Sequence, residues 1–176
     1  MRRDRYLTTL CVAAAALAVA GLSALPAMAA ARVIGAFEDW SAHQFDAEEG
    51  KVCYLYGEPR KSAGEYARRG ETYLQVTHRA ADGSRNVVSV TAGYSYRKDS
   101  EVTITIDGQK FSLFTDSDTA WAGDAAADNA LVGAMRAGRS MVVEGISSRG
   151  TTTADTYSLS GFTAAHNAVD KACSAK

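Results

Sequence analysis

The chain has 176 residues, and its 19 basic and 20 acidic side chains leave a formal net charge of −1 at pH 7. This balance argues against general nucleic-acid binding, which requires a basic surface, so we expect no nucleic-acid partner. The length allows a short leader and one domain whose core is large enough to fold unaided.

Residues 1–29 carry the pattern of a secretory signal peptide. A positively charged start is followed by an alanine-rich apolar run from Leu7 to Leu25, and Ala27-Met28-Ala29 offers small residues at both positions that guide cleavage. The apolar run approaches the length that spans a membrane, so an uncleaved anchor is the alternative. We expect cleavage, which leaves residues 30–176 as a single exported domain with no transmembrane segment.

Alternating apolar and polar residues predict about eight short strands in this domain. In chain order they are Trp40–Phe45, Lys51–Tyr56, Thr72–Arg79, Asn86–Ala92, Val102–Ile106, Lys110–Phe114, Ser140–Ile146 and Thr153–Ser160. The first two form a hairpin, and so do the fifth and sixth, because Asp107-Gly108 is a residue pair that a type I′ turn favours. Gly57–Gly70 is predicted as a long surface loop.

Two short helices are predicted in the second half of the domain. Asp124 can cap the first helix and Gly138 ends it, while Gly161 separates the last strand from the second helix. Their apolar stripes are Ala127, Leu131, Ala134 and Met135, and then Phe162, Ala165, Val169 and Ala172. These elements predict a mainly β fold, an antiparallel β-sandwich or open barrel with two short helices, the last one C-terminal.

Two cysteines remain after the leader, Cys53 and Cys173. An even number of cysteines in an exported protein favours a disulfide, which would tie the start of the domain to its last helix. Two free buried thiols are the alternative. A metal site is disfavoured because neither cysteine has a nearby Cys or His at ligand spacing.

The sequence offers no catalytic set, no metal ligands and no cofactor motif. We find no His, Cys or carboxylate near His43, His78 or His166 at a spacing that a strand or helix would bring together around a metal. Gly145–Gly150 approaches the nucleophile-elbow pattern of serine hydrolases, but its second glycine comes one position late, and the surroundings predict a hairpin.

Basic residues gather in the predicted loop Gly57–Gly70, and they give the domain its most plausible binding surface. An aromatic ring among several cations could receive an anionic partner, such as a phosphorylated lipid or an acidic protein face, through charge-assisted hydrogen bonds. An ordinary solvated loop is the alternative. The candidate binding residues are Arg60, Lys61, Tyr66, Arg68 and Arg69.

The C-terminal residues Ser158–Ala165, with the pattern Ser-Leu-x-Gly-Phe-x-x-Ala, resemble the invasion-associated locus B family of exported proteins from Gram-negative alphaproteobacteria. The resemblance extends over essentially the whole mature chain, through Lys51–Tyr54, the Thr103–Phe114 hairpin and Asp118–Ala122. Many members have a cysteine shortly after the first tryptophan, where this chain has Ala42 and His43. This departure weighs against a disulfide within the first hairpin and strengthens the pairing of Cys53 with Cys173.

The resemblance implies a periplasmic or outer-membrane-associated β-rich domain, linked in some pathogens to host-cell entry, and it supplies no catalytic motif. We therefore expect a non-enzymatic binding or interaction protein that serves host-cell invasion or envelope integrity. Its expected partner is an envelope or host protein or an anionic surface, and the sequence does not set its oligomeric state. The alternative is a hydrolase or carbohydrate-active enzyme whose residues converge only in the folded chain.

Overall fold

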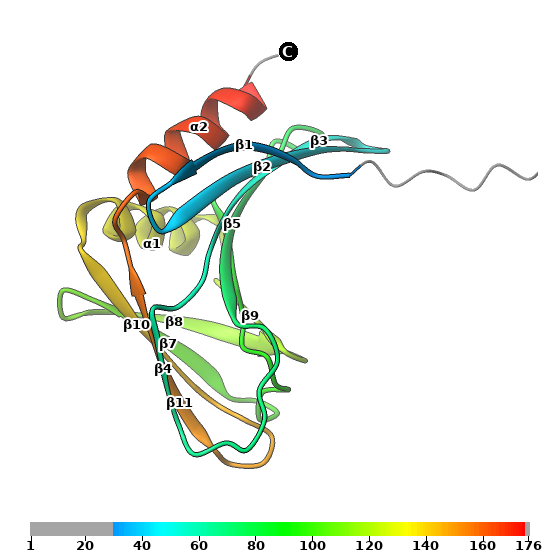
Figure 1. Cartoon of the computed structure of the whole chain (residues 1–176). Helices are drawn as coiled ribbons and strands as arrows, with labels where there is room; N and C mark the ends of the chain where they lie inside the picture. The colour runs from blue at the N-terminus through cyan, green and yellow to red at the C-terminus, as the bar shows by residue number, and fades with distance from the viewer. Residues whose placement is uncertain (1–29, 175–176) are drawn as a thin grey trace, which may run out of the picture.

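A computed structural model of the chain describes residues 30–174 (Figure 1). The segment that we interpret as a signal peptide, residues 1–29, lies outside the described residues. Within the described range the elements are β1 (Arg32–Phe37), β2 (Trp40–Ala47), β3 (Gly50–Gly57), β4 (Lys61–Ala63), β5 (Tyr73–Arg79), β6 (Val87–Thr91), β7 (Glu101–Ile106), β8 (Gln109–Asp116), β9 (Thr119–Trp121), α1 (Ala125–Ala137), β10 (Ser140–Ile146), β11 (Thr152–Ser158) and α2 (Phe162–Ser174).

The described strands form one antiparallel sheet in the order β1-β2-β3-β5-β6-β9-β8-β7-β10-β11-β4. Its edge strands, β1 and β4, do not pair with each other, so the sheet is open. Figure 1 shows the sheet strongly curved, with β1, β2 and β3 beside α2 at one end and β10, β11 and β4 at the other. The mainly β fold with a C-terminal helix is confirmed.

The hairpin β7–β8 turns at the residue pair that predicted it. Asp107 has a φ of 48° and Gly108 a φ of 83°, so both central residues adopt the positive φ that a type I′ turn requires. The register places Ile106 opposite Gln109 and continues to Glu101 opposite Phe114. Local turn chemistry therefore sets this part of the sheet.

Three strands were not predicted: β1, β4 and β9. Strands β4 and β9 have only three residues each, too few for an alternating pattern, and a register shift after Val33 interrupts β1. The prediction of an unbroken surface loop over Gly57–Gly70 was wrong, because Lys61–Ala63 pairs with Ala154–Thr156 of β11. That pairing joins segments far apart in sequence and leaves no local signal.

The curvature of the sheet brings the β1–β2 turn against the end of β11. Trp40 Nε1 donates a hydrogen bond to the carbonyl oxygen of Ser158 over 3.0 Å, and the Trp40 ring meets Phe162 edge to face with centroids 5.0 Å apart. Gly161 has a φ of +84°, and a Cβ there would clash with the carbonyl oxygen of Phe37. The pattern Ser158–Ala165 is therefore architectural, since it joins the two ends of the sheet to α2.

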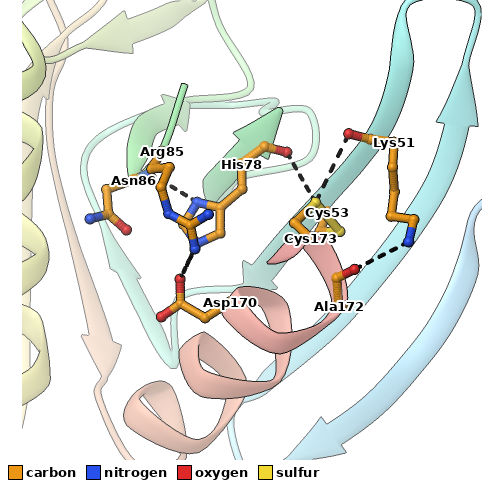
Figure 2. The surroundings of a disulfide bond; sticks show 8 residues. All are labelled: Lys51, Cys53, His78, Arg85, Asn86, Asp170, Ala172 and Cys173. Atoms are coloured by element: carbon orange, nitrogen blue, oxygen red, sulfur yellow. Dashed lines mark hydrogen bonds and ion pairs between the residues drawn. A yellow bond between two sulfur atoms is a disulfide. The ribbon is translucent and has the colours of Figure 1, made fainter. Parts of the chain in front are cut away.

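Both helices begin and end near the predicted residues. Asp124 caps α1 by accepting a hydrogen bond from the amide of Ala127 over 2.8 Å. Helix α2 packs on β1, β2, β3 and β5, and the disulfide Cys53–Cys173, with Cα atoms 5.9 Å apart, confirms the predicted pairing (Figure 2). Neither helix in the described part of the chain is long and apolar enough to cross a membrane.

Candidate functional site

A cavity of about 560 Å³ opens where three loops meet at the end of the sheet that carries β4. The segment between β4 and β5 contributes Glu65, Tyr66 and Arg68. The segment after β6 contributes Tyr94 and Ser95, and the β10–β11 connection contributes Ser147, Ser148, Arg149 and Thr151, with Thr153 at the start of β11. We call this cavity the arginine cleft, after Arg68 and Arg149.

The two arginines that line the cleft have no ion-pair partner within residues 30–174. Arg68 and Arg149 are both exposed, and no hydrogen bond joins either guanidinium to another described side chain. Glu65 is the one acidic residue in the lining. The cleft therefore combines two available cations with a single carboxylate, and its charge favours an anionic ligand.

A buried ion pair supports the cleft from beneath. Arg69 donates to both carboxylate oxygens of Asp155, over 2.7 and 2.6 Å, and its Nε donates to the carbonyl oxygen of Ala92 over 2.6 Å. The two charged side chains are only 6% and 4% exposed. Although burial opposes its charge, the bonds to Asp155 raise the pKa of Arg69 above its usual value. Arg69 therefore stays charged and is unavailable to a ligand.

Two tyrosines complete this support and reach the lining. The guanidinium of Arg69 lies 5.4 Å from the ring centroid of Tyr66 and 5.1 Å from that of Tyr94, within the range of cation–π attraction. The hydroxyl of Tyr94 shares a 2.7 Å hydrogen bond with Thr153 Oγ1, and burial raises the pKa of Tyr94. Arg69 thus fixes the aromatic walls of the cleft.

The five candidate binding residues do not form one surface. Tyr66 and Arg68 line the arginine cleft, Arg69 lies under it, and Lys61 is exposed on β4. Arg60 forms an ion pair with Asp39 in a separate hollow beside the β1–β2 turn. That any of the five binds a partner stays a prediction.

Sequence reasoning missed Arg149 and Tyr94 as members of the site. Both lie on loops distant in sequence from Gly57–Gly70, and only the folded sheet brings them to Tyr66 and Arg68. One signal was present in the sequence, because Arg149 belongs to Gly145–Gly150, which approaches the nucleophile-elbow pattern.

Among the described residues, no histidine hydrogen-bonds to a serine that lines the cleft. Ser147 Oγ accepts a hydrogen bond from the backbone N–H of Thr151 over 3.1 Å, within the β10–β11 connection. No histidine lines the cleft. A serine–histidine contact exists elsewhere, where Ser41 Oγ and His43 Nε2 lie 2.8 Å apart on β2. Within residues 30–174 no carboxylate hydrogen-bonds to His43, so the third group of a triad is missing there.

A second polar cluster lies between α2 and β5, close to the disulfide (Figure 2). His78 is 1% exposed and His166 3% exposed. Asp170 faces both, with Oδ2 3.1 Å from His166 Nδ1 and Oδ1 3.0 Å from His78 Nε2, the latter without the alignment of a hydrogen bond. Arg85 donates a hydrogen bond to Asp170 Oδ1 over 2.5 Å.

The expectation that no histidine has a carboxylate at helical spacing was wrong, because Asp170 follows His166 by four residues.

The ligand-type atoms of His78, His166 and Asp170 all lie within 4.8 Å of one another, as they would around a metal ion. However, His78 Nδ1 accepts the backbone N–H of Asn86 over 2.9 Å. A neutral imidazole that accepts at one nitrogen carries its proton on the other, so Nε2 has no lone pair to offer a metal. A ligating histidine normally donates from its second nitrogen instead. The cluster is therefore better explained as an anchor between α2 and β5.

The family model described as Invasion associated locus B (IalB) protein matches residues 40–170. The chain belongs to this family. The matched range contains the arginine cleft, the Arg69–Asp155 pair and the histidine cluster, and it confirms the resemblance carried by Ser158–Ala165. IalB membership is consistent with an invasion-associated envelope protein. No curated protein and no solved structure matches the chain.

The histidine cluster should make the stability of this IalB-family domain depend on pH. Burial lowers the pKa of His78 and of His166, and protonation of His78 would also break its hydrogen bond with Asn86. The unfolded chain therefore takes up more protons than the folded one once the pH falls below about 6.5. Arg85 and Arg136 also face the cluster, and their positive charges disfavour protonation of the histidine rings. Stability is lost as pH falls through this window.

We expect the free energy of unfolding to fall by an amount on the order of 1 kcal/mol between pH 7.5 and 5.5, measured by urea unfolding. The double variant His78→Asn/His166→Gln should flatten this dependence, because the amides can replace an acceptor and a donor without titrating. His43→Gln, on half-exposed β2, is the matched control and should leave most of the dependence. An unchanged slope in the double variant would contradict the assignment.

Asp170 contributes in a lower pH range. Its partial burial opposes ionisation, but the hydrogen bond from Arg85 and the two nearby histidines lower its pKa below the usual 3.8. The corresponding stability is present above that value and is lost as pH falls through the folded pKa. The acid limb of the same unfolding series should therefore steepen again below about pH 4.

Proposed function

We propose that this IalB-family protein is an exported, non-enzymatic interaction module of the bacterial envelope, periplasmic or attached to the outer membrane, that binds an anionic partner in the arginine cleft. The observation that carries the proposal is a concave cavity lined by two guanidinium groups, Arg68 and Arg149, that have no ion-pair partner among residues 30–174. Guanidinium groups bind carboxylates, phosphates and sulfates through paired hydrogen bonds, and a concave site shields those bonds from water.

The rigidity beneath the cleft supports binding as its role. The Arg69–Asp155 pair and the Tyr94–Thr153 hydrogen bond hold the walls in place before a ligand arrives. A preformed site loses little conformational entropy on binding, so more of the contact energy remains as affinity. The cleft is thus suited to recognition of a partner.

The proposed location follows from two further observations. Residues 1–29 have the pattern of a secretory signal peptide, and the Cys53–Cys173 disulfide is of the kind that persists in an oxidising compartment. Membership of the IalB family supports a role in host-cell invasion or in envelope integrity.

The test is binding of the purified mature protein to isolated outer-membrane fragments and to host-cell surfaces, measured by sedimentation. We expect Arg68→Glu/Arg149→Glu to weaken binding at least about tenfold, since each charge-assisted hydrogen bond contributes about 1.5–3 kcal/mol. The control Lys110→Glu/Lys171→Glu carries the same change in net charge at exposed positions of β8 and α2 that do not line the cleft. It should stay within about threefold of the wild type, because distant charges act only through screened attraction. Equal losses in both variants would remove the cleft from the proposal.

A hydrolase is the second candidate, and the Ser41–His43 contact is the observation that favours it. Ser41 also lines the hollow beside the β1–β2 turn. The two functions are separable with a fluorophosphonate probe, which labels activated serines. Labelling of Ser41 that is lost in His43→Gln would support the hydrolase, whereas an unlabelled protein would support the interaction module.

A further inference from the structure

We infer that the ligand of the arginine cleft is an acidic oligosaccharide, a sugar chain that carries carboxylate or sulfate groups. This inference rests on the proposed function and narrows the anionic partner to one chemical class. Three features of the cleft carry it: its shape, its hydroxyl-rich lining and the placement of its charges.

The shape of the cleft favours a chain segment over a flat partner. A cavity of about 560 Å³ between three loops is large enough to enclose a segment of a chain-like ligand. Among the described residues the large exposed hydrophobic side chains are Val33, Tyr66 and Phe114, and of these only Tyr66 is at the cleft. The cleft therefore lacks the apolar cluster with which a protein inserts into a bilayer.

The lining is rich in hydroxyl groups. Ser95, Ser148 and Thr151 line the cleft together with the bonded pair Tyr94 and Thr153. A hydroxyl group both donates and accepts, which matches the hydroxyls along a sugar ring. Tyr66, 37% exposed and held in place by Arg69, adds an aromatic body on which the apolar face of a sugar can rest.

The charges favour an acidic sugar over a densely charged polyanion. Arg68 and Arg149 supply two separate guanidinium forks, each matched to a carboxylate or sulfate group. Glu65 lies in the same lining and would repel a ligand charged at every position, such as polyphosphate. A sugar chain offers hydroxyls that can donate to Glu65 between its acidic groups. The cleft therefore suits alternating acidic and hydroxyl chemistry.

The experiment is isothermal titration calorimetry of the disulfide-bonded mature protein with defined probes. An oligogalacturonate supplies carboxylates, a heparin-derived oligosaccharide supplies sulfates, and maltohexaose is the neutral control. Vesicles of phosphatidylglycerol test a lipid source of negative charge. We expect at least one acidic oligosaccharide to bind at least about tenfold more tightly than maltohexaose, with affinity that falls as salt rises. The better of the two acidic probes identifies the acidic group.

Two variants separate the contributions of charge and ring. Arg68→Gln/Arg149→Gln should lower the affinity for the acidic probe about tenfold or more and reduce the salt dependence of that affinity. Tyr66→Ala should weaken binding while the salt dependence stays, and its thermal unfolding shows whether Arg69 remains in place. The arginine variant changes only exposed side chains, so it keeps the test valid if Tyr66→Ala destabilises the fold.

The binding results separate the acidic-sugar assignment from the broader proposal that the cleft binds an anionic partner. Equal binding of maltohexaose and the acidic probes would overturn the acidic-sugar assignment. Binding of vesicles or outer-membrane fragments that depends on Arg68 and Arg149, with no sugar binding, would also overturn it but would leave the proposed function standing. Absence of any binding that depends on the two arginines would overturn both.

Discussion

Replacement of Arg69 by methionine is expected to lower the free energy of unfolding by about 3–5 kcal/mol. The change leaves the carboxylate of Asp155, 4% exposed, without its two guanidinium bonds. It also removes the cation that Tyr66 and Tyr94 contact. A buried charge without a partner is costly, and this cost, more than the attraction within the pair, sets the size of the effect.

Urea unfolding followed by tryptophan fluorescence measures this loss. The matched control is Arg68→Met, one residue earlier and exposed, which should change stability by no more than about 0.5 kcal/mol. The double variant Arg69→Met/Asp155→Leu should recover much of the loss, because both charges are then absent. A loss below about 1 kcal/mol for Arg69→Met would show that the pair is not a main support of the fold.

Arg69 supports the walls of the cleft and does not offer its guanidinium to a partner. The basic loop suggested Arg69 as a contact for a partner. However, the guanidinium of Arg69 already donates hydrogen bonds to Asp155 and to the carbonyl oxygen of Ala92. Weaker ligand binding in an Arg69 variant would therefore reflect displaced walls of the cleft and not a lost contact. Arg68 and Arg149 are the residues whose variants report on contact.

Removal of the disulfide by Cys53→Ala/Cys173→Ala is expected to lower stability by up to about 4–5 kcal/mol, since the bond closes a long loop of the unfolded chain. The two cysteines are separated by 120 residues. In the folded protein the bond joins β3 to the last turn of α2, where the backbone oxygens of Lys51 and His78 also approach Cys173 (Figure 2). The end of α2 should lose its attachment first.

Unfolding with and without reductant, together with hydrogen exchange, tests this expectation. Reductant should lower the stability of the wild type toward that of the double variant and leave the variant unchanged. Amide protection should fall most in the last turn of α2. Mass spectrometry of the non-reduced mature protein should show a two-proton deficit and a linked Cys53–Cys173 peptide. Two thiols open to alkylation would contradict the bond.

The sequence by itself determined the features whose causes are local. Asp107-Gly108 specified a turn, Asp124 capped α1, and alternating residues marked the longer strands. The even number of cysteines predicted the disulfide, and Ser158–Ala165 indicated the IalB family that the family model then matched. Each signal depends on neighbouring residues or on a count, so no knowledge of the packed sheet was needed.

Only the tertiary structure decided where the arginines lie. Arg68 and Arg69 are adjacent in sequence and identical in chemistry, yet one lines a cavity and the other is buried against Asp155. Arg149 reaches the same cavity from a distant connection. The histidine cluster arose in the same way, as β5 brought His78 to α2. Long-range strand pairing creates these contacts, and it depends on the register of the whole curved sheet, which no local pattern records.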